Sequence, residues 1–327
     1  MVQTEPHLVT LIKLVDEIPE LPSLEKRKRG RPKRYSDRLM VKALMLMIVR
    51  RLYTAHSLLA FLGQETDLTK MLKQSLSADG KFPTRRTWER RLAQLPQTLP
   101  SLIGAFGRYL VKLLEPFKQE GRAVALDSTA LRANGGVWHQ KDRQKGIVPH
   151  KSIDTEAGWS KSGYHGWWYG WKLHLACTIG SVWIPLAACL TVANSSDSEK
   201  AIELVQELSD DVLYCLGDKH YRGEDFRAYC RLTGRILITP RSGTYPHKDA
   251  GAEVRKVFHK LRSQAIEPFN GLFKTIFEWR GEVPVKGLLR TQVIVLGAVF
   301  LYQLVLLYQF CMGKALAKNV KSFLRAS

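Results

Sequence analysis

Two aspartates beyond residue 122 directly follow short apolar segments that are typical of strands. Asp127 follows residues 123–126 and Asp218 follows residues 212–217, while a third acid, Glu267, lies in a basic helical region. Functional sites collect at strand ends in open α/β sheets, and converging carboxylates repel one another unless a cation shares them. Three carboxylates bind Mg²⁺ with positions left for water and phosphate oxygens. The pattern therefore predicts a metal centre, with helix capping as the alternative role of these acids.

Other acids compete with these three. Asp142 and Asp154 are alternatives to Asp127, but both lie in a polar, loop-like stretch, and a ligand held on a strand is better positioned. The remaining competitors are expected to be structural, as helix-surface acids or in a first helical turn, where the dipole stabilises a carboxylate. They are Glu253, Glu278 and Asp197.

The elements expected to position the acids form an α/β domain, preceded by a helical region. Strands are predicted over residues 123–129, 172–179, 182–190, 212–217 and 236–239, and helices over 197–208, 224–232 and 253–279. Upstream, helices are predicted after Ser36, over 56–62, after Thr84 or Thr87 as alternative N-caps, and over 102–117. Residues 291–313 carry no charge and reach the length of a membrane span, but the glutamines within them favour a buried helix.

The charge of the chain points to a polyanionic partner. It has 50 Lys and Arg against 30 Asp and Glu, a formal net charge of +20. The densest basic run is 26–34, whose Arg-Gly-Arg-Pro resembles the core of an AT-hook that inserts into a narrow minor groove. A solvated basic linker is the alternative. In either case, DNA contacts are predicted for Arg29, Arg31, Lys33 and Arg34.

Two further groups bear on nucleic acid. The helix predicted after Thr84 presents Arg86, Arg90 and Arg91 as one exposed face, which would enter a major groove or contact only phosphates. Aromatic side chains just before the strand at 172–179 would stack on frayed or flipped bases, or pack in the core. These are Trp159, Tyr164, Trp167, Trp168, Tyr169 and Trp171.

Composition excludes several classes of protein. Apolar residues make up 45% of the chain, which rules out wholesale disorder. The five cysteines include no C-x-x-C pair, so neither a disulfide framework nor a zinc site is expected. Cys177, Cys189 and Cys215 lie in apolar runs, which indicates buried thiols in a reducing cytosol. No secretory signal is expected, and the predicted location is cytoplasmic and nucleoid-associated.

Residues from about 122 to 310 resemble the DDE transposases of bacterial insertion sequences. The similar segments are 124–129, 169–175, 190–198, 217–221 and 266–274, in the order of that family. Gly30-Arg31-Pro32, leading into Tyr35-Ser36-Asp37, is similar to the helical DNA-binding domains of these proteins. The resemblance implies an α/β fold: a ribonuclease-H-like mixed sheet flanked by helices, preceded by an all-α N-terminal DNA-binding domain. The implied parts are a basic arm (1–34), the helical domain (35–120), the catalytic domain (121–312) and a basic tail (313–327).

The resemblance also implies an activity. Asp127, Asp218 and Glu267 would be a catalytic triad that holds two divalent ions, Mg²⁺ with Mn²⁺ as a substitute. The reaction would be cleavage at terminal inverted repeats and transfer of the 3′ ends to target DNA. The implied partners are double-stranded DNA and a second copy of the chain in a synaptic homodimer, with no membrane. The alternatives are a catalytically inactive DNA-binding descendant and a metal-dependent nuclease that does not join ends.

The family signature around the glutamate is a tyrosine, an arginine three residues on, the glutamate, and a lysine seven beyond it. Lys274 fits this spacing and would lie on the helical face of Glu267, where its charge meets a phosphate. By contrast, His259 stands where the tyrosine is expected, Arg262 precedes Glu267 by five positions rather than four, and Pro268 follows the glutamate. Arg262 and Lys274 are predicted to contact DNA.

Overall fold

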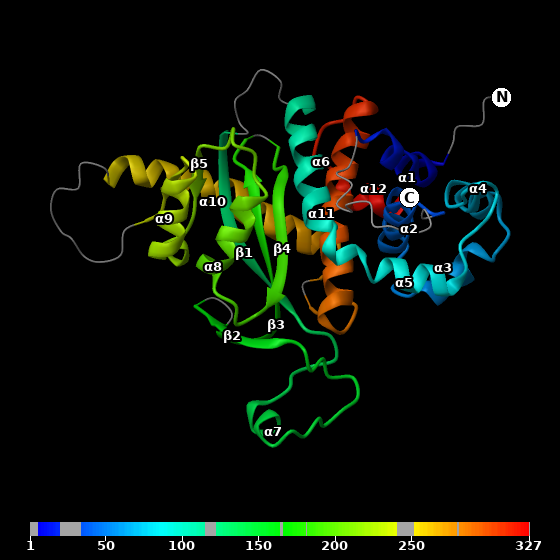
Figure 1. Ribbon diagram of the computed structural model, residues 1–327, viewed down its shortest axis with the longest axis horizontal. Coiled ribbons are helices and arrows are strands. Elements are labelled where there is room, and N and C mark those ends of the chain that lie inside the picture. Colours follow the sequence, from blue (N-terminus) through cyan, green and yellow to red (C-terminus); the bar gives the residue numbers. More distant parts are fainter. Residues whose placement is uncertain are drawn as a thin grey trace, which may run out of the picture. The chain divides into compact units, whose positions relative to one another are not determined.

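The structure is a computed structural model that describes residues 6–19, 34–114, 122–163, 166–180, 182–240, 252–279 and 281–326 (Figure 1). Its internal contacts divide the chain into two compact units. The first, the helical unit, comprises Met1–Leu102 and Leu289–Ser327, and the second, the sheet unit, comprises Ile103–Leu288.

The helical unit contains α1 (His7–Glu17), α2 (Asp37–Val49), α3 (Ala55–Leu62), α4 (Asp67–Ser75), α5 (Arg85–Leu92), α11 (Leu288–Cys311) and α12 (Val320–Ala326). The helix α6 (Leu99–Leu114) begins there and continues into the sheet unit. The sheet unit contains β1 (Ala123–Arg132), α7 (Gln140–Gln144), β2 (Gly158–Ser162), β3 (Gly166–Thr178), β4 (Pro185–Val192), α8 (Asp197–Gln206), β5 (Tyr214–Leu216), α9 (Glu224–Leu232), β6 (Ile236–Ile238) and α10 (Ala252–Ile276). The short 3₁₀ turns η1 (Leu95–Gln97) and η3 (Lys219–Tyr221) are also present among the described residues.

Side-chain caps start the helices where the sequence predicts them. Ser36 accepts the amide of Leu39 at the start of α2, and Thr84 accepts the amide of Thr87 at the start of α5. Thr54 forms a reciprocal capping box with Ser57 at the start of α3, which begins one residue before the predicted position. Such caps satisfy amides that have no partner within the helix, so the local sequence determines these boundaries.

The uncharged stretch near the C-terminus forms a buried helix, as predicted. Among the described residues, one helix, α11, is long enough and apolar enough to cross a membrane. Its most apolar window has a mean hydropathy of 2.1. However, 94% of that window is buried inside the protein. A β-carbon at Gly297 would lie 2.7 Å from Leu44, so the missing side chain allows α11 to approach α2 closely. By its contacts, α11 groups with the helical unit.

The sheet of the second unit is mixed. Its strand order is β2-β3-β1-β5-β6, and β4 also pairs with β3 (Figure 1). β3 runs antiparallel to β1, β2 and β4, whereas β5 runs parallel to both β1 and β6. The strand predicted over 172–179 extends back to Gly166, so the aromatic residues from Trp167 to Trp171 lie within β3 rather than before a strand. Trp159 lies in β2, and Tyr164 lies outside the described residues. Cys177 and Cys215 are buried free thiols, and Cys189 is a partly buried one.

Helices cover the two faces of this sheet. Asp127 is paired with Leu175 and Ser128 with His174, and side chains alternate along a strand, so Asp127 and His174 point to opposite faces. Asp127 faces α10, from which Asn270 donates to it, and His174 lies on the face of Lys172, which pairs with Asp197 of α8. The catalytic candidate is thus directed toward the one helix that carries Glu267.

Candidate active site

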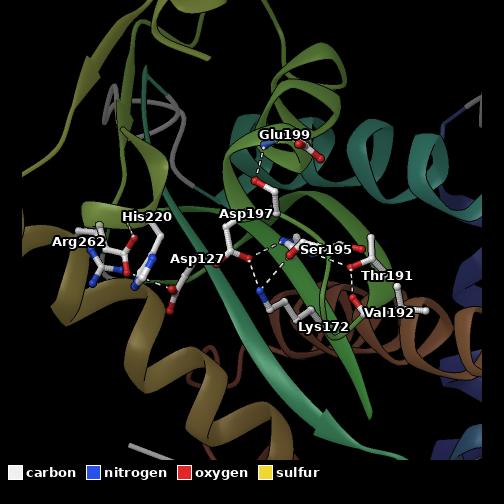
Figure 2. A network of polar contacts seen from close by, with 12 residues as sticks. Asp127, Lys172, Thr191, Val192, Ser195, Asp197, Glu199, His220 and Arg262 are labelled. Carbon is white, nitrogen blue, oxygen red and sulfur yellow. Dashed lines mark hydrogen bonds and ion pairs between the residues drawn. The ribbon is translucent and has the colours of Figure 1, made fainter. Parts of the chain in front are cut away.

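Two side chains of α10 contact the carboxylate of Asp127, and one of them also contacts Glu267. The amide nitrogen of Asn270 donates to Asp127 Oδ2 over 3.0 Å, and Arg262 Nη1 lies 3.8 Å from Asp127 Oδ1. The same guanidinium donates through Nη2 to Glu267 Oε1 over 3.0 Å. Figure 2 shows Arg262 beside Asp127. Arg262 therefore links two of the three carboxylates that the sequence predicts to act together.

The proline after Glu267 does not end the helix. Pro268 has no amide to donate, so it removes one hydrogen bond from the helical ladder, yet α10 continues to Ile276. Because the helix is uninterrupted, Glu267 and Asn270 remain three residues apart on one side of it. Lys274 lies seven residues beyond Glu267 on the same face and is partly buried.

Asp218 lies just beyond the end of β5, where it also caps η3. Its Oδ1 accepts the amide of His220 over 2.7 Å. The preceding glycine is required by packing, since a β-carbon at Gly217 would lie 2.6 Å from Tyr221 Cβ. Tyr221 is 1% exposed, and its hydroxyl has no hydrogen-bond partner among the described residues. The motif 217–221 thus holds an acid at a strand end over a buried ring.

Burial and mutual repulsion change the acidity of Asp127. Burial is the largest cause and raises its pKa to about 7; Arg262 opposes this shift, and the charges of Asp218 and Glu267 add to it. Both other acids are therefore close enough to Asp127 to act on it electrostatically. A carboxyl group that titrates near neutrality is typical of a functional site.

The raised pKa of Asp127 predicts a pH dependence of folding stability. The native state binds this proton up to about pH 7, whereas the unfolded chain releases it near 3.8, so stability should fall as the pH rises through this range. The fall attributable to Asp127 is up to about 4 kcal/mol. Urea unfolding at both ends of the range would measure it. An equally steep fall in Asp127→Asn would contradict the assignment.

The donor set suits a divalent metal ion. Carboxylate and amide oxygens are the ligands that Mg²⁺ prefers, and the buried Oδ1 of Asn270 has no hydrogen-bond partner among the described residues. The repulsion that raises the pKa of Asp127 is also what a shared cation would relieve. Within the described residues, however, no three acidic, histidine or cysteine side chains are gathered closely enough to hold an ion by themselves. In this structure, the charge nearest to Asp127 and Glu267 is that of Arg262.

A second polar network lies on the other face of the sheet (Figure 2). Lys172 Nζ contacts Asp197 Oδ1 at 3.2 Å and donates to the carbonyl of Ser195 over 3.0 Å. His174 is fully buried, its Nε2 contacts Thr191 Oγ1 at 2.9 Å, and burial lowers its pKa to about 4, so it is neutral. These contacts join β3 to the start of α8 and agree with the structural role predicted for Asp197.

The predicted DNA-binding residues are distributed over both units. Arg34, Arg86 and Arg90 are exposed in the helical unit. The prediction that Arg91 shares their exposed face is wrong, because Arg91 is 6% exposed and pairs with Asp37 and the carbonyl of Tyr35. Arg262, also predicted to contact DNA, is buried against the carboxylates. Arg29, Arg31 and Lys33 lie outside the described residues.

The competing acids have other surroundings. Asp154 is 3% exposed and accepts the amides of Glu156 and Gly287, so it anchors the loop that contains it. Asp142 is partly buried in α7, and Glu278 is exposed after the end of α10. Nothing is described of the side chain of Glu253. Asp218 and Glu267 raise the pKa of Asp127, whereas none of the described competitors is among the groups that shift it, which favours the original three acids.

Sequence reasoning missed one residue of this site. Asn270 was part of the segment 266–274 that resembles the family, but it received no role. Its position three residues after Glu267, on the same side of the helix, was the available signal.

A comparison with family models identifies the family of this chain. A family model described as the transposase DDE domain matches residues 118–303, more than half of the chain, which therefore belongs to the DDE transposase family. No curated protein matches. Among solved structures, "Mos1 transposase paired-end complex with left transposon end" is similar with 14% sequence identity and a TM-score of 0.23, over 85% of this chain and 80% of that chain.

Proposed function

We propose that the chain is an active transposase that cleaves DNA at the ends of its element and joins the freed 3′ ends to target DNA. The observation that carries the proposal is the convergence of Asp127 from β1 and Glu267 from α10 on Arg262, with Asp218 close enough to raise the pKa of Asp127. The antiparallel strands β4, β3 and β1, continued by the parallel strands β5 and β6, support a ribonuclease-H-like class for the sheet unit.

Within this proposal, Asp127, Asp218 and Glu267 would hold divalent metal ions, Mg²⁺ or Mn²⁺. Bound there, the metal would activate the attacking oxygen and stabilise the leaving one. Asn270 orients Asp127 by donating to one of its oxygens, and Tyr221 and Gly217 hold Asp218 at the strand end. Lys274 lies on the helical face of Glu267, where its charge would attract a DNA phosphate.

The helical unit would bind the element ends. In this proposal, Arg86 and Arg90 contact DNA together with the basic run 26–34. We expect Arg86→Gln/Arg90→Gln to weaken binding to duplex DNA and to lower the salt slope of the affinity by up to about 2. Fluorescence anisotropy over a range of salt concentrations measures both quantities.

The matched control is Lys13→Gln/Lys70→Gln, which removes two exposed charges from α1 and α4. If the control lowered the salt slope as much as the arginine pair, binding would depend on net charge alone, and the α5 assignment would fail.

The test of the proposed function is excision from a plasmid that carries this gene with its native flanking sequence. Excision and rejoining that require Mg²⁺ or Mn²⁺ would establish the transposase and reveal the repeats in the sequenced product ends. A synaptic homodimer on two element ends and a cytoplasmic, nucleoid-associated location are parts of the same proposal.

One observation favours the catalytically inactive alternative. The guanidinium of Arg262 is already paired with two of the three carboxylates, from a position that departs by one residue from the family signature. DNA binding without excision or cleavage would support that reading. Cleavage without joining would instead indicate a nuclease.

A further inference from the structure

A row of aromatic side chains lies along one face of the hairpin formed by β2 and β3. Lys161 is paired with Trp167 across the strands, and Trp159 with Tyr169. Because side chains alternate along each strand, these four residues share a face. Exposure rises along the row: Tyr169 is 3% exposed, Trp159 is partly buried, and Trp167 is 65% exposed.

The two inner rings are anchored by hydrogen bonds. The hydroxyl of Tyr169 donates to the carbonyl of Asp154 over 2.6 Å, and the indole nitrogen of Trp159 donates to the carbonyl of Trp138 over 2.8 Å. Their ring centroids lie 5.5 Å apart. Together with the buried Trp168 and Trp171, these rings fulfil the packing role that the sequence analysis gave as one alternative.

Trp167 has different surroundings. It meets Trp159 edge-on, with ring centroids 6.4 Å apart and ring planes at 77°. Lys161 Nζ lies 5.7 Å from the centroid of the Trp167 ring. Most of its apolar surface is in water, although burial of such a surface would be favourable. The hairpin therefore presents a large π surface beside a cation.

The neighbouring surface is basic. Lys141, Arg143 and Lys145 are exposed in and after α7, on the segment that connects β1 to β2 and that Figure 1 shows extending away from the sheet. The nearby carboxylates of Asp154 and Glu156 instead accept the amides of Gly287 and Leu288. The four exposed cations of this segment, which include Lys151, outnumber its exposed or partly buried acids, Asp142 and Glu156, so its outward charge is net positive and suits a nucleic acid strand.

We propose that Trp167 and Lys161 form a stacking site for an unpaired nucleobase of DNA bound to the sheet unit. An indole stacks on any base, because every base has a π face, and the adjacent ammonium attracts the phosphate. A paired base inside a duplex is already stacked on both sides, so the ligand is a base at a strand end, a nick or a flipped position. The inference rests on the proposed function for the presence of DNA.

The register of β3 limits where that base lies. Leu175 pairs with Asp127 and is eight residues beyond Trp167 along the strand, which corresponds to at most about 26 Å. A duplex covers that length in about eight base pairs. One bound DNA can therefore contact both Trp167 and the carboxylates.

Binding to two duplexes tests the proposal, one blunt and one with a short single-stranded extension that contains 2-aminopurine. Metal is removed with EDTA so that binding is measured without cleavage. Wild type should prefer the extended duplex and quench the 2-aminopurine. Trp167→Ala should lose about tenfold in affinity for the extended duplex alone. Trp167→Phe should retain most of the preference, and Lys161→Gln should lower the salt slope by about 1.

Leu232→Ala is the matched control, since Leu232 is 85% exposed on α9, and this variant should leave both affinities unchanged. The inference is overturned if Trp167→Ala binds both duplexes like wild type, or weakens both equally. It is also overturned if the variant changes the oligomeric state while the preference persists, because Trp167 would then contact a second copy. A Trp167-dependent preference without excision would refute only the proposed function, and excision without that preference would refute only this inference.

Discussion

Asp218→Asn should abolish DNA cleavage and leave DNA binding intact or slightly stronger. The substitution removes one carboxylate from the proposed metal centre, and it also removes a negative charge that repels phosphate. The loss of cleavage should exceed the roughly 10–100-fold effect of removing an outer partner of a metal ligand. Folding should be preserved, because asparagine can still accept the amide of His220 that caps η3. A cleavage assay on purified protein with Mg²⁺, paired with anisotropy for binding, measures both effects.

The control for this prediction is Asp225→Asn, which makes the same change of charge at an exposed position in the first turn of α9. It should cleave like wild type. Cleavage by Asp218→Asn at the wild-type rate would show that Asp218 is not part of the active site.

Arg262→Met should destabilise the fold by about 2–3 kcal/mol near pH 9, where Asp127, with a pKa of about 7, is ionised. The arginine is 4% exposed and compensates the charge of Asp127, whose side chain is 19% exposed. Removing one member of a fully buried ion pair costs about 3–5 kcal/mol, and the partial exposure of Asp127 reduces this. Glu267 contributes little, since its side chain is 57% exposed. Urea unfolding of both proteins measures the difference.

A double-mutant cycle separates charge compensation from packing. If Arg262 acts through Asp127, Asp127→Asn/Arg262→Met should be more stable than the sum of the single changes predicts. Arg262→Lys should be intermediate, because a point charge cannot span both carboxylates as the guanidinium does. Strict additivity of the two single changes would contradict the role of Arg262 as the counter-charge of Asp127.

Much of the sheet unit was predictable because its signals are local. An apolar segment followed by an acid predicted the end of β5 near Asp218, and the helix predicted over 224–232 has the bounds of α9. The same signal was wrong for Asp127, which lies within β1, because that strand continues to Arg132 through its pairing with β3. Caps such as Ser36 act over three residues, so a short window of sequence contains the whole interaction.

The remaining features depend on contacts between distant parts of the chain. Arg91 was predicted to be exposed, but its partner Asp37 lies 54 residues earlier. From the sequence, Arg262 looks like a surface residue, because a spacing of five residues places it on a different side of the helix from Glu267. Only packing against β1 brings its long side chain between the carboxylates of Asp127 and Glu267. In the aromatic run, Trp167 is exposed next to the closing end of the β2–β3 hairpin, whereas Tyr169 on the same face and Trp168 on the other are buried. This difference required the register of β2 and β3.

The most direct test of the central claim is Mn²⁺ binding to the full chain. The claim is that Asp127, Asp218 and Glu267, carried by three separate elements, form one divalent-metal centre. Electron paramagnetic resonance of Mn²⁺, with calorimetry for affinity, should show binding to wild type and to Asp225→Asn. Each single change, Asp127→Asn, Asp218→Asn or Glu267→Gln, should weaken it by more than about tenfold. Undiminished Mn²⁺ binding in all three variants would contradict the claim.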